Sequence, residues 1–349
     1  MYQTSDLHVR ETRPLVTPNQ LRHQFPMTDA TARLIANTRD SIRQILSGSD
    51  RRLLVIVGPC SIHDQHAAYD YARQLYPLRV ELKQQLEIVM RVYFEKPRTR
   101  IGWKGLINDP HLDGTFDINT GLQIARQLLL DLAHLGLPAA TELLDPITPQ
   151  YIADLVTWTA IGARTTESQT HREMASGLSM PVGFKNSTDG SIHTAVNAIV
   201  SAGQPHCFLG INQSGYASIV TTTGNPDGHL VMRGGKQGSN YDETQVKQAV
   251  CELSRHGLVP KVMMDCSHGN AEGDHNRQGL ALQSVAHQIL TGSTHFMGVM
   301  IESHLVAGKQ SIPSDLKQLT YGQSITDACV DLTTTTRMLR TLAQAVEGS

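Results

Sequence analysis

Residues 53–91 read LLVIVGPCSIHDQHAAYDYARQLYPLRVELKQQLEIVMR, and this stretch predicts a strand, a helix and a second strand. The two apolar runs are short and rich in Val and Ile, which is typical of buried parallel strands. The segment between them has the length and the apolar spacing of an amphipathic helix. Units of this kind indicate an α/β fold built on a parallel sheet.

The same unit recurs along the chain, so that eight apolar runs read as strands. Each run ends in, or is closely followed by, a residue able to bind a metal, a phosphate or a carboxylate: Cys60, Arg91, Glu142, Arg164, Lys185, Arg233, His268 and Glu302. Parallel strands that close into a barrel bring their carboxyl ends together over one mouth, where (β/α)8 enzymes carry their chemistry. We therefore expect a (β/α)8 TIM barrel with its active site at the strand ends.

Two segments depart from this alternation. Residues 1–48 contain DATARLIANTRDSIRQILSG, whose apolar residues repeat at helical spacing before a glycine, and predict an N-terminal extension with one amphipathic helix. Before the sixth barrel strand, HCFLGI and YASIVTTT are separated by a polar, Gly-containing turn, which predicts a β-hairpin inserted at about residues 205–225. The catalytic barrel is expected to span residues 49–349.

Composition excludes some classes of protein. The formal net charge of −2 over 349 residues gives no overall field for nucleic acid or for an anionic membrane, and the cations gather at strand ends rather than along one helix face. The first residues lack the apolar core of a signal peptide, and no run approaches the roughly 20 apolar residues of a membrane span. We expect a soluble, cytoplasmic protein without nucleic-acid or membrane partners.

Four scattered residues form a candidate metal site. Cys60, His268 and Glu302 stand at strand ends, and Asp327 lies in YGQSITDAC near the C-terminus. A thiol, an imidazole and two carboxylates suit one catalytic divalent ion such as Mn, Fe, Co or Zn. The alternative is that Cys60 is a small buried hydrophobic residue, as most free cysteines are. Five cysteines at irregular spacing in a large chain argue against a disulfide framework.

Cations at the strand ends form a candidate anion site. A single Arg usually makes a surface ion pair, but several converging on one mouth would repel one another unless an anion neutralised them. The amount of positive charge suggests two phosphorylated substrates. Lys185 has a second interpretation as a Schiff-base lysine of the kind many aldolases use. The cations in question are Arg91, Lys96, Arg98, Arg164, Lys185 and Arg233.

These motifs together resemble the microbial type I 3-deoxy-D-arabino-heptulosonate-7-phosphate (DAHP) synthases, and the resemblance covers nearly the whole chain. It is carried by GPCSIHD, MRVYFEKPRT, GWKGLINDP, GARTTESQ, PVGFKN, MRGGK, DCSHGN, ESHL and YGQSITDAC. The resemblance implies the first reaction of the shikimate pathway, in which phosphoenolpyruvate condenses with erythrose 4-phosphate and water to give DAHP and phosphate. It would make the chain a transferase of chorismate and aromatic amino acid biosynthesis.

The resemblance also implies a role for individual residues. The metal ligands match Cys60, His268, Glu302 and Asp327. The phosphoenolpyruvate site matches Arg91, Lys96, Arg164, Lys185 and Arg233. The erythrose 4-phosphate contacts match Pro97, Arg98 and Thr99, Lys96 matches a proton donor, and Glu142 matches a carboxylate that orders the reacting water. Arg100 and Ser187 differ from the residues typical of the family at these positions. We expect these differences to adjust the activity and not to abolish it.

Regulation is implied for the segments outside the barrel. In the family, the N-terminal extension and the inserted hairpin bind an aromatic amino acid that inhibits the enzyme, and they help to form homodimers or homotetramers. The segments REMASGLSMPVGFKN, GINQ and GNPDGH favour the tyrosine-sensitive isozymes over those sensitive to phenylalanine or tryptophan.

Alternatives remain at this point. A sister synthase that uses arabinose 5-phosphate shares the barrel, although KPRT, GARTTESQ and the long extension favour the erythrose enzyme. A non-catalytic barrel that senses metabolites should have lost a metal ligand or a phosphate cation, and none is missing.

A disulfide between Cys60 and Cys329 is a further hypothesis. Cys329 lies two residues beyond Asp327, so it could form a disulfide with Cys60 when metal is lost, provided their α-carbons approach within roughly 7 Å.

Overall fold

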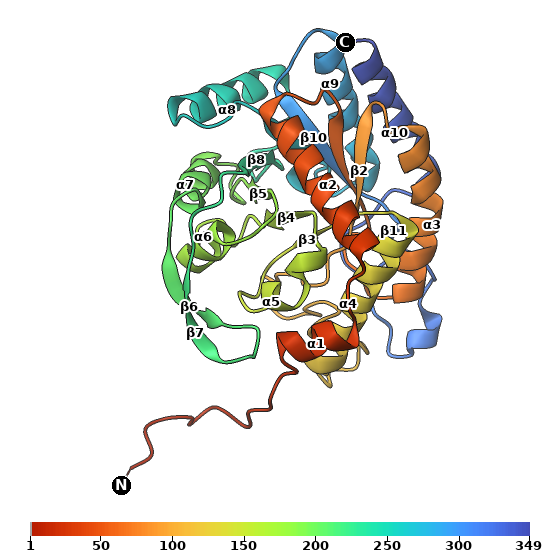
Figure 1. Cartoon of the computed structure of the whole chain (residues 1–349). Helices are drawn as coiled ribbons and strands as arrows, with labels where there is room; N and C mark the ends of the chain where they lie inside the picture. The colour runs from red at the N-terminus through yellow and green to blue at the C-terminus, as the bar shows by residue number, and fades with distance from the viewer. Residues whose placement is uncertain (1) are drawn as a thin grey trace.

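The computed structural model describes residues 2–349 and contains a closed barrel of parallel strands, as predicted (Figure 1). Going around the barrel, each strand pairs with the next in chain order, and the last pairs with the first. The barrel strands are β1 (Leu53–Gly58), β2 (Leu86–Arg91), β3 (Ala139–Glu142), β4 (Trp158–Ile161), β5 (Val182–Lys185), β8 (Gly228–Met232), β9 (Val262–Asp265) and β10 (Phe296–Glu302).

Closure of the barrel brings the first and last strands into parallel register, with Leu54 opposite Gly298 and Gly58 opposite Glu302. Gly58 has φ +156°, and a Cβ atom there would lie 2.6 Å from the carbonyl oxygen of Arg91. A side chain at this position would therefore push β1 away from β2, just before the turn that presents Cys60.

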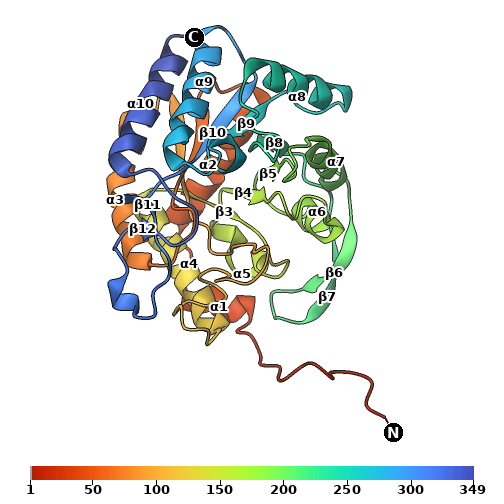
Figure 2. The same ribbon diagram turned by 180° about the vertical axis from the view of Figure 1, so that it is seen from behind.

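Helices surround the barrel, and Figure 2 shows α9 and α10 side by side on its outer surface. Their starts are set by side-chain caps: Asp64 accepts hydrogen bonds from the N–H groups of His66 and Ala67 at the start of α3. The helices of the barrel region are α3 (Gln65–Glu81), α4 (Ile118–Leu135), α5 (Pro149–Ile152), α6 (Gln169–Ser176), α7 (His193–Ala202), α8 (Glu243–Arg255), α9 (Gln278–Leu290) and α10 (Leu332–Glu347).

The N-terminal extension contains two helices, α1 (Pro18–Gln24) and α2 (Asp29–Ser47), so the expectation of a single helix was wrong. The short first helix starts at a capping box, in which Thr17 and Gln20 satisfy each other's backbone N–H groups, with Pro18 in its first turn. In Figure 1, residues 2–13 form a segment without helix or strand that leaves the body of the protein.

Helix α2 closes one end of the barrel. Its residues Ile42, Ile45 and Leu46 are buried in the same apolar cluster as side chains from the barrel interior, among them Ile56 and Trp158. Figure 1 shows this helix crossing the barrel. This helix of the extension is therefore packed against the interior of the barrel.

The inserted hairpin consists of β6 (Cys207–Ile211) and β7 (Ala217–Thr221), which pair antiparallel as predicted. Leu209 and Ile219 face each other across the pair and are 89% and 76% exposed. The turn of the hairpin lies beside α1, where the N–H of Asn19 donates to the carbonyl oxygen of Gln213 at 2.9 Å. One face of the hairpin is thus apolar and uncovered within the protomer.

After the last barrel strand, the chain forms a small parallel pair, β11 (Val306–Lys309) and β12 (Gln323–Ser324). Four short 3-10 helices complete the fold: η1 (Ala153–Leu155), η2 (His268–Asn270), η3 (His275–Arg277) and η4 (Leu316–Gln318). Within residues 2–349, no helix combines the length and the apolar character needed to cross a bilayer.

Candidate active site

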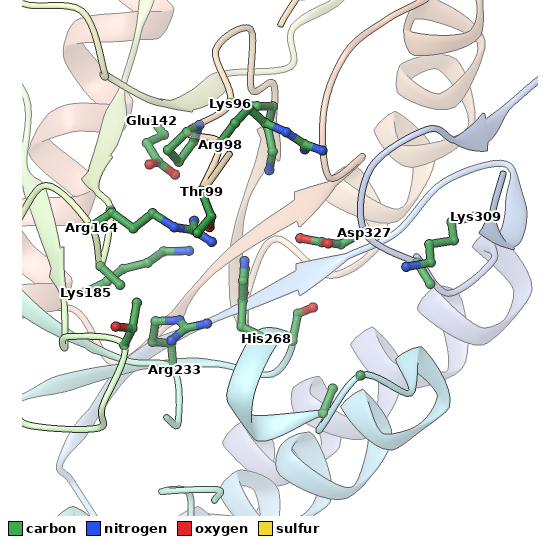
Figure 3. A pocket seen from close by; sticks show the side chains of 18 of the residues that line it. Lys96, Arg98, Thr99, Glu142, Arg164, Lys185, Arg233, His268, Lys309 and Asp327 are labelled. Atoms are coloured by element: carbon green, nitrogen blue, oxygen red, sulfur yellow. The ribbon is translucent and has the colours of Figure 1, made fainter. Parts of the chain in front are cut away.

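A cavity of about 610 Å³ opens at the carboxyl ends of the barrel strands. Most of the residues predicted from sequence line this cavity, and Figure 3 shows labelled side chains such as Arg164, Lys185 and Arg233 around it. These residues are Lys96, Pro97, Arg98, Thr99, Glu142, Arg164, Lys185, Arg233, His268 and Asp327. The other three, Cys60, Arg91 and Glu302, are fully buried and do not belong to the lining.

The four predicted metal ligands lie together. Donor atoms of Cys60, Glu302 and Asp327 fall within 4.8 Å of one another. Nε2 of His268 lies 3.7 Å from Oε1 of Glu302. One soft sulfur and two carboxylates from separate segments are therefore clustered, with the imidazole beside one of the carboxylates, and this donor set fits a divalent transition metal.

The pKa values of the Cys60 thiol and the Glu302 carboxyl are shifted in opposite directions. Burial, together with the charge of Glu302, raises the pKa of Cys60 to about 11. Burial also opposes ionisation of Glu302, but the charges of His268 and Arg91 outweigh it and hold the pKa of this carboxyl at about 2. The carboxylate is therefore ready to bind a cation, whereas the thiol would lose its proton only on binding one.

Arg91 supports the ligands from behind. Its Nη2 atom donates to Oε1 of Glu302 at 2.9 Å and to the carbonyl oxygen of Cys60 at 3.2 Å. Nε donates to the carbonyl oxygen of Pro59 at 3.1 Å, and the guanidinium lies 3.4 Å above the ring of Tyr93. The fully buried guanidinium therefore fixes the chain before Cys60 and one oxygen of Glu302.

Lys96 joins the ligand cluster to the cavity. It lines the cavity, and its Nζ lies 3.2 Å from Sγ of Cys60 and 3.3 Å from the carbonyl oxygen of Cys60. Burial works to lower the pKa of Lys96, but the pKa is raised overall by Cys60 and by the carboxylates around it. The ammonium is therefore held charged between the thiol and the substrate space.

Arg164 and Arg233 line the cavity from opposite sides of Lys185 in Figure 3. Neither has a carboxylate within salt-bridge distance in the described part of the chain. Lys185 differs, since its Nζ lies 2.9 Å from Oδ2 of Asp265. The two arginines are thus available to an anion, while the lysine already has a counter-ion.

Asp265 was missed by the sequence reasoning, which took His268 as the functional residue of DCSHGN. It is the last residue of β9 and is fully buried, with Oδ2 also 2.9 Å from Nδ1 of His268. Burial disfavours its charged form, but His268 and Lys185 hold the pKa of this carboxyl well below its usual range. Its position as a polar residue at the end of an apolar strand was a signal that could have revealed it.

Glu142 ends β3 and lines the cavity. Its Oε1 atom is buried and has no hydrogen-bond partner among the described residues. The adjacent Gly162 leaves room for this oxygen, because a Cβ atom at that position would lie 2.2 Å from it. A buried acceptor without a donor is suited to hold a water molecule or a polar group of a ligand.

The loop after β2 forms one rim of the cavity with Pro97, Arg98 and Thr99. Lys309, at the end of β11, lines the same cavity and lies on the side of Asp327 in Figure 3. A second cavity of about 440 Å³ is also lined by both Arg98 and Lys309. Lys309 was not predicted, because it stands outside the eight barrel strands.

The chain matches the DAHP synthetase I family over residues 24–340. It is 53% identical over 344 residues to the Tyr-sensitive phospho-2-dehydro-3-deoxyheptonate aldolase of Escherichia coli K12, covering 99% of this chain and 96% of that one. It is 55% identical over 347 residues to the Phe-sensitive enzyme of the same organism, with 99% of both chains covered.

Among solved structures, a phospho-2-dehydro-3-deoxyheptonate aldolase from Francisella tularensis SCHU S4 superimposes with a TM-score of 0.95 and 49% sequence identity. This similarity covers 97% of the present chain and 99% of that chain. Both comparisons extend over the barrel, the hairpin and most of the N-terminal extension. The chain therefore belongs to the DAHP synthetase I family, the type I DAHP synthases.

Proposed function

We propose that the chain condenses phosphoenolpyruvate with erythrose 4-phosphate to give DAHP and inorganic phosphate, the first step of the shikimate pathway. The observation that carries this proposal is one cavity in which unpaired cations lie beside a cluster of Cys60, Glu302 and Asp327. Condensing two phosphorylated substrates requires both features, since the anions need counter-charge and the aldehyde needs an electrophilic catalyst.

Phosphoenolpyruvate is held by its phosphate and carboxylate on the cations of the cavity. Arg164 and Arg233 have guanidinium forks suited to two anionic oxygens each, and Lys185 adds a third cation. Arg91 contributes from beneath, because its contacts with Glu302 and with the carbonyl oxygen of Cys60 keep that wall of the site in position. The ion pair of Lys185 with Asp265 supports an anion contact over a Schiff base.

Cys60, His268, Glu302 and Asp327 would hold the divalent ion, which on the donor set is Mn, Fe, Co or Zn. Such an ion would supply Lewis-acid polarisation of the aldehyde oxygen. The chain's own contribution is to position the aldehyde next to C3 of phosphoenolpyruvate, with the phosphate end of erythrose 4-phosphate on Pro97, Arg98 and Thr99.

In the reaction, C3 of phosphoenolpyruvate forms a bond to the aldehyde carbon, and the aldehyde oxygen gains a proton. A water oxygen adds to C2 and releases one proton, which replaces the proton given to the aldehyde oxygen. The C2–O bond to phosphate then breaks, the C2 carbonyl forms, and the second water proton leaves with the phosphate. Lys96 is the proton donor, as a buried ammonium that lines the cavity. Glu142 orders the water through its unpartnered buried oxygen.

An aromatic amino acid, with tyrosine favoured, is proposed as a feedback inhibitor. A separate cavity of about 400 Å³ between the N-terminal helices and α5 supports an effector site, since its lining includes Arg22, Arg39, Asp154 and Gln213. The lining combines apolar side chains with charges that suit an amino acid zwitterion. The identities of 53% and 55% to the Tyr-sensitive and Phe-sensitive relatives do not separate the two effectors.

A homodimer or homotetramer is proposed as the assembly. The exposed apolar face of the hairpin, with Leu209 and Ile219 paired across it, supports a contact with a second copy of the chain. Light scattering of the wild-type protein and of Leu209→Glu tests this proposal, and a monomeric wild type would contradict it.

The test of function is consumption of phosphoenolpyruvate with erythrose 4-phosphate, with and without chelator, and then with each aromatic amino acid. We expect activity that requires both substrates and is abolished by the chelator. Higher activity with arabinose 5-phosphate would favour the sister synthase, and no turnover with any aldose phosphate would favour a metabolite-sensing barrel. Inhibition by phenylalanine or tryptophan alone would contradict the preference for tyrosine.

A further inference from the structure

One carboxylate oxygen is shared between the proposed anion site and the proposed metal site. Oδ2 of Asp265 lies 2.9 Å from Nζ of Lys185 and 2.9 Å from Nδ1 of His268. The other oxygen accepts a hydrogen bond from the backbone N–H of Ser267 at 3.0 Å, which fixes the carboxylate plane. Asp265 is 0% exposed, so water does not compete for either contact.

The two partners of this oxygen come from different parts of the barrel. Lys185 ends β5 and His268 follows β9, while β8 lies between these two strands in the barrel. Asp265 therefore reaches across one intervening strand to contact the lysine. Asp265 thus directly contacts both a cation of the lining, Lys185, and a proposed metal ligand, His268.

The contact with His268 is close but incomplete. Although Nδ1 lies 2.9 Å from Oδ2, the ring nitrogen does not make a hydrogen bond of acceptable angle, and it counts as a buried polar atom without a partner. The contact with Lys185, in contrast, is a hydrogen-bonded ion pair. In this structure the carboxylate of Asp265 therefore interacts more strongly with Lys185 than with His268.

We propose that Asp265 is a positioning residue that couples metal binding at His268 to anion binding at Lys185. The proposal rests on the proposed function, since it takes the metal ligands and the phosphoenolpyruvate cations from it. When the Nε2 atom of His268 binds a cation, the ring keeps its proton on Nδ1 and donates it to a carboxylate, which here is Asp265. That donation weakens the hold of Asp265 on Lys185, and the ammonium becomes available to the substrate anion.

Anion binding at Lys185 should in turn favour metal binding at His268. An anion that draws Lys185 away leaves Asp265 to orient the ring of His268, with Nε2 directed toward the other ligands. By linkage, the factor by which a metal ion tightens phosphoenolpyruvate binding equals the factor by which phosphoenolpyruvate tightens metal binding. A purely structural carboxylate would lower stability or both affinities when replaced, and would leave this factor unchanged.

The experiment measures this factor without turnover. The dissociation constant of phosphoenolpyruvate is determined by calorimetry for the full-length protein, with and without Mn²⁺ and in the absence of erythrose 4-phosphate, and that of Mn²⁺ is determined with and without phosphoenolpyruvate. We expect a coupling factor of about 5–150 in the wild type. Asp265→Asn, which keeps the size of the side chain, should reduce the factor at least about threefold.

Ser267→Ala is the matched control. It removes the hydroxyl that donates to Oε2 of Glu302 at 2.7 Å but keeps the backbone N–H that holds Asp265. This variant should bind Mn²⁺ more weakly while its coupling factor stays at the wild-type value. An equal fall in the coupling factor for Ser267→Ala would overturn the assignment to Asp265.

A second measurement uses the wild-type protein, so it does not depend on the folding of Asp265→Asn. The Nδ1 resonance of His268, assigned by comparison with His268→Gln, should shift when phosphoenolpyruvate is added to metal-free protein. An unmoved resonance, or an unchanged coupling factor in folded Asp265→Asn, would overturn this inference alone. Failure of the wild type to bind Mn²⁺ or phosphoenolpyruvate would instead overturn the proposed function, and this inference with it.

Discussion

The Nζ atom of Lys96 lies 3.2 Å from the Sγ atom of Cys60, so the proposed proton donor directly contacts a proposed metal ligand. This relationship connects two functions within one buried cluster. A change to the lysine should therefore alter both the proposed proton transfer and the charge beside the thiol.

Replacing Lys96 with methionine should reduce kcat by about 10²–10⁴-fold, the usual contribution of a positioned general acid. Methionine keeps much of the length of the side chain but cannot donate a proton. Steady-state kinetics with both substrates would measure the loss. Lys83→Met, on the exposed chain after α3, is the control and should leave kcat unchanged. Intact turnover in Lys96→Met would remove the lysine from the mechanism.

Removal of divalent ions should abolish activity, and added Mn²⁺ should restore it. Asp327→Asn should weaken Mn²⁺ binding at least about tenfold, because an amide is a poorer ligand than a carboxylate. Calorimetry measures the affinity, and Asp315→Asn, which lies outside the ligand cluster, serves as the control. Full activity in the presence of excess chelator would contradict the proposed metal site.

Lys309→Ala should raise the KM for erythrose 4-phosphate about three- to tenfold, the usual effect of losing one hydrogen bond at an exposed position. The KM for phosphoenolpyruvate should change little, since Lys309 lines the cavity on the side of Asp327 and away from Arg164 and Arg233 (Figure 3). Lys317→Ala, on exposed η4, provides a control of equal charge. If KM for the two substrates rose together, Lys309 would not belong to a separate subsite.

Glu95 should make stability depend on pH. Burial raises the pKa of this carboxyl from 4.5 to about 8, although the N–H groups of Leu144 and Asp145 donate hydrogen bonds to it. Between these two values, the folded protein retains a proton that the unfolded chain has released. The resulting stabilisation is fully present below pH 4.5 and is lost as pH rises through 8.

Urea unfolding at pH 6 and pH 8.5 tests this expectation. The free energy of unfolding of the wild type should fall with pH by an amount to which Glu95 contributes at most about 1.4 kcal/mol per pH unit. Glu95→Gln, which cannot ionise, should show a smaller decline over the same range. Parallel pH profiles for the two proteins would mean that Glu95 has an ordinary pKa.

Exposure of metal-free protein to air should cost two thiols if Cys60 and Cys329 form a disulfide. Both are buried and free in the structure, along with Cys266. Thiols would be counted after unfolding, where the reduced protein gives five. Cys329→Ser should lose none on the same exposure. A full count for the oxidised wild type would reject the disulfide.

The barrel was predictable because its signal is local and repeated. The spacing of apolar residues differs between short strands such as LLVIVG and helices such as 65–81, so the two are easily told apart. Eight repeats of strand and helix leave few alternatives to a closed barrel. The hairpin was predictable for the same reason, since its two runs are joined by a polar turn. Helix α1 was missed because its seven residues carry too short a periodic pattern, although Thr17, Pro18 and Gln20 form a recognisable start.

The site was predictable only in part, because the direction of a side chain at a strand end depends on the whole barrel. Arg91 stands at the end of β2 but points into the protein, where it contacts Glu302 instead of the cavity. Asp265 and Lys309 gain their significance from segments distant in sequence, namely β5 and the loop after β2. No pattern within a single segment encodes such contacts.

The packing of helix α2 has a consequence for the proposed feedback regulation. Its residues Ile42, Ile45 and Leu46 belong to the apolar cluster of the barrel interior. A chain shortened to begin at residue 49 would leave those barrel side chains open to water and should be recovered mainly as aggregate. Removing α2 would therefore disrupt the fold together with the proposed effector site, whereas single substitutions that keep α2 packed would affect the proposed site alone.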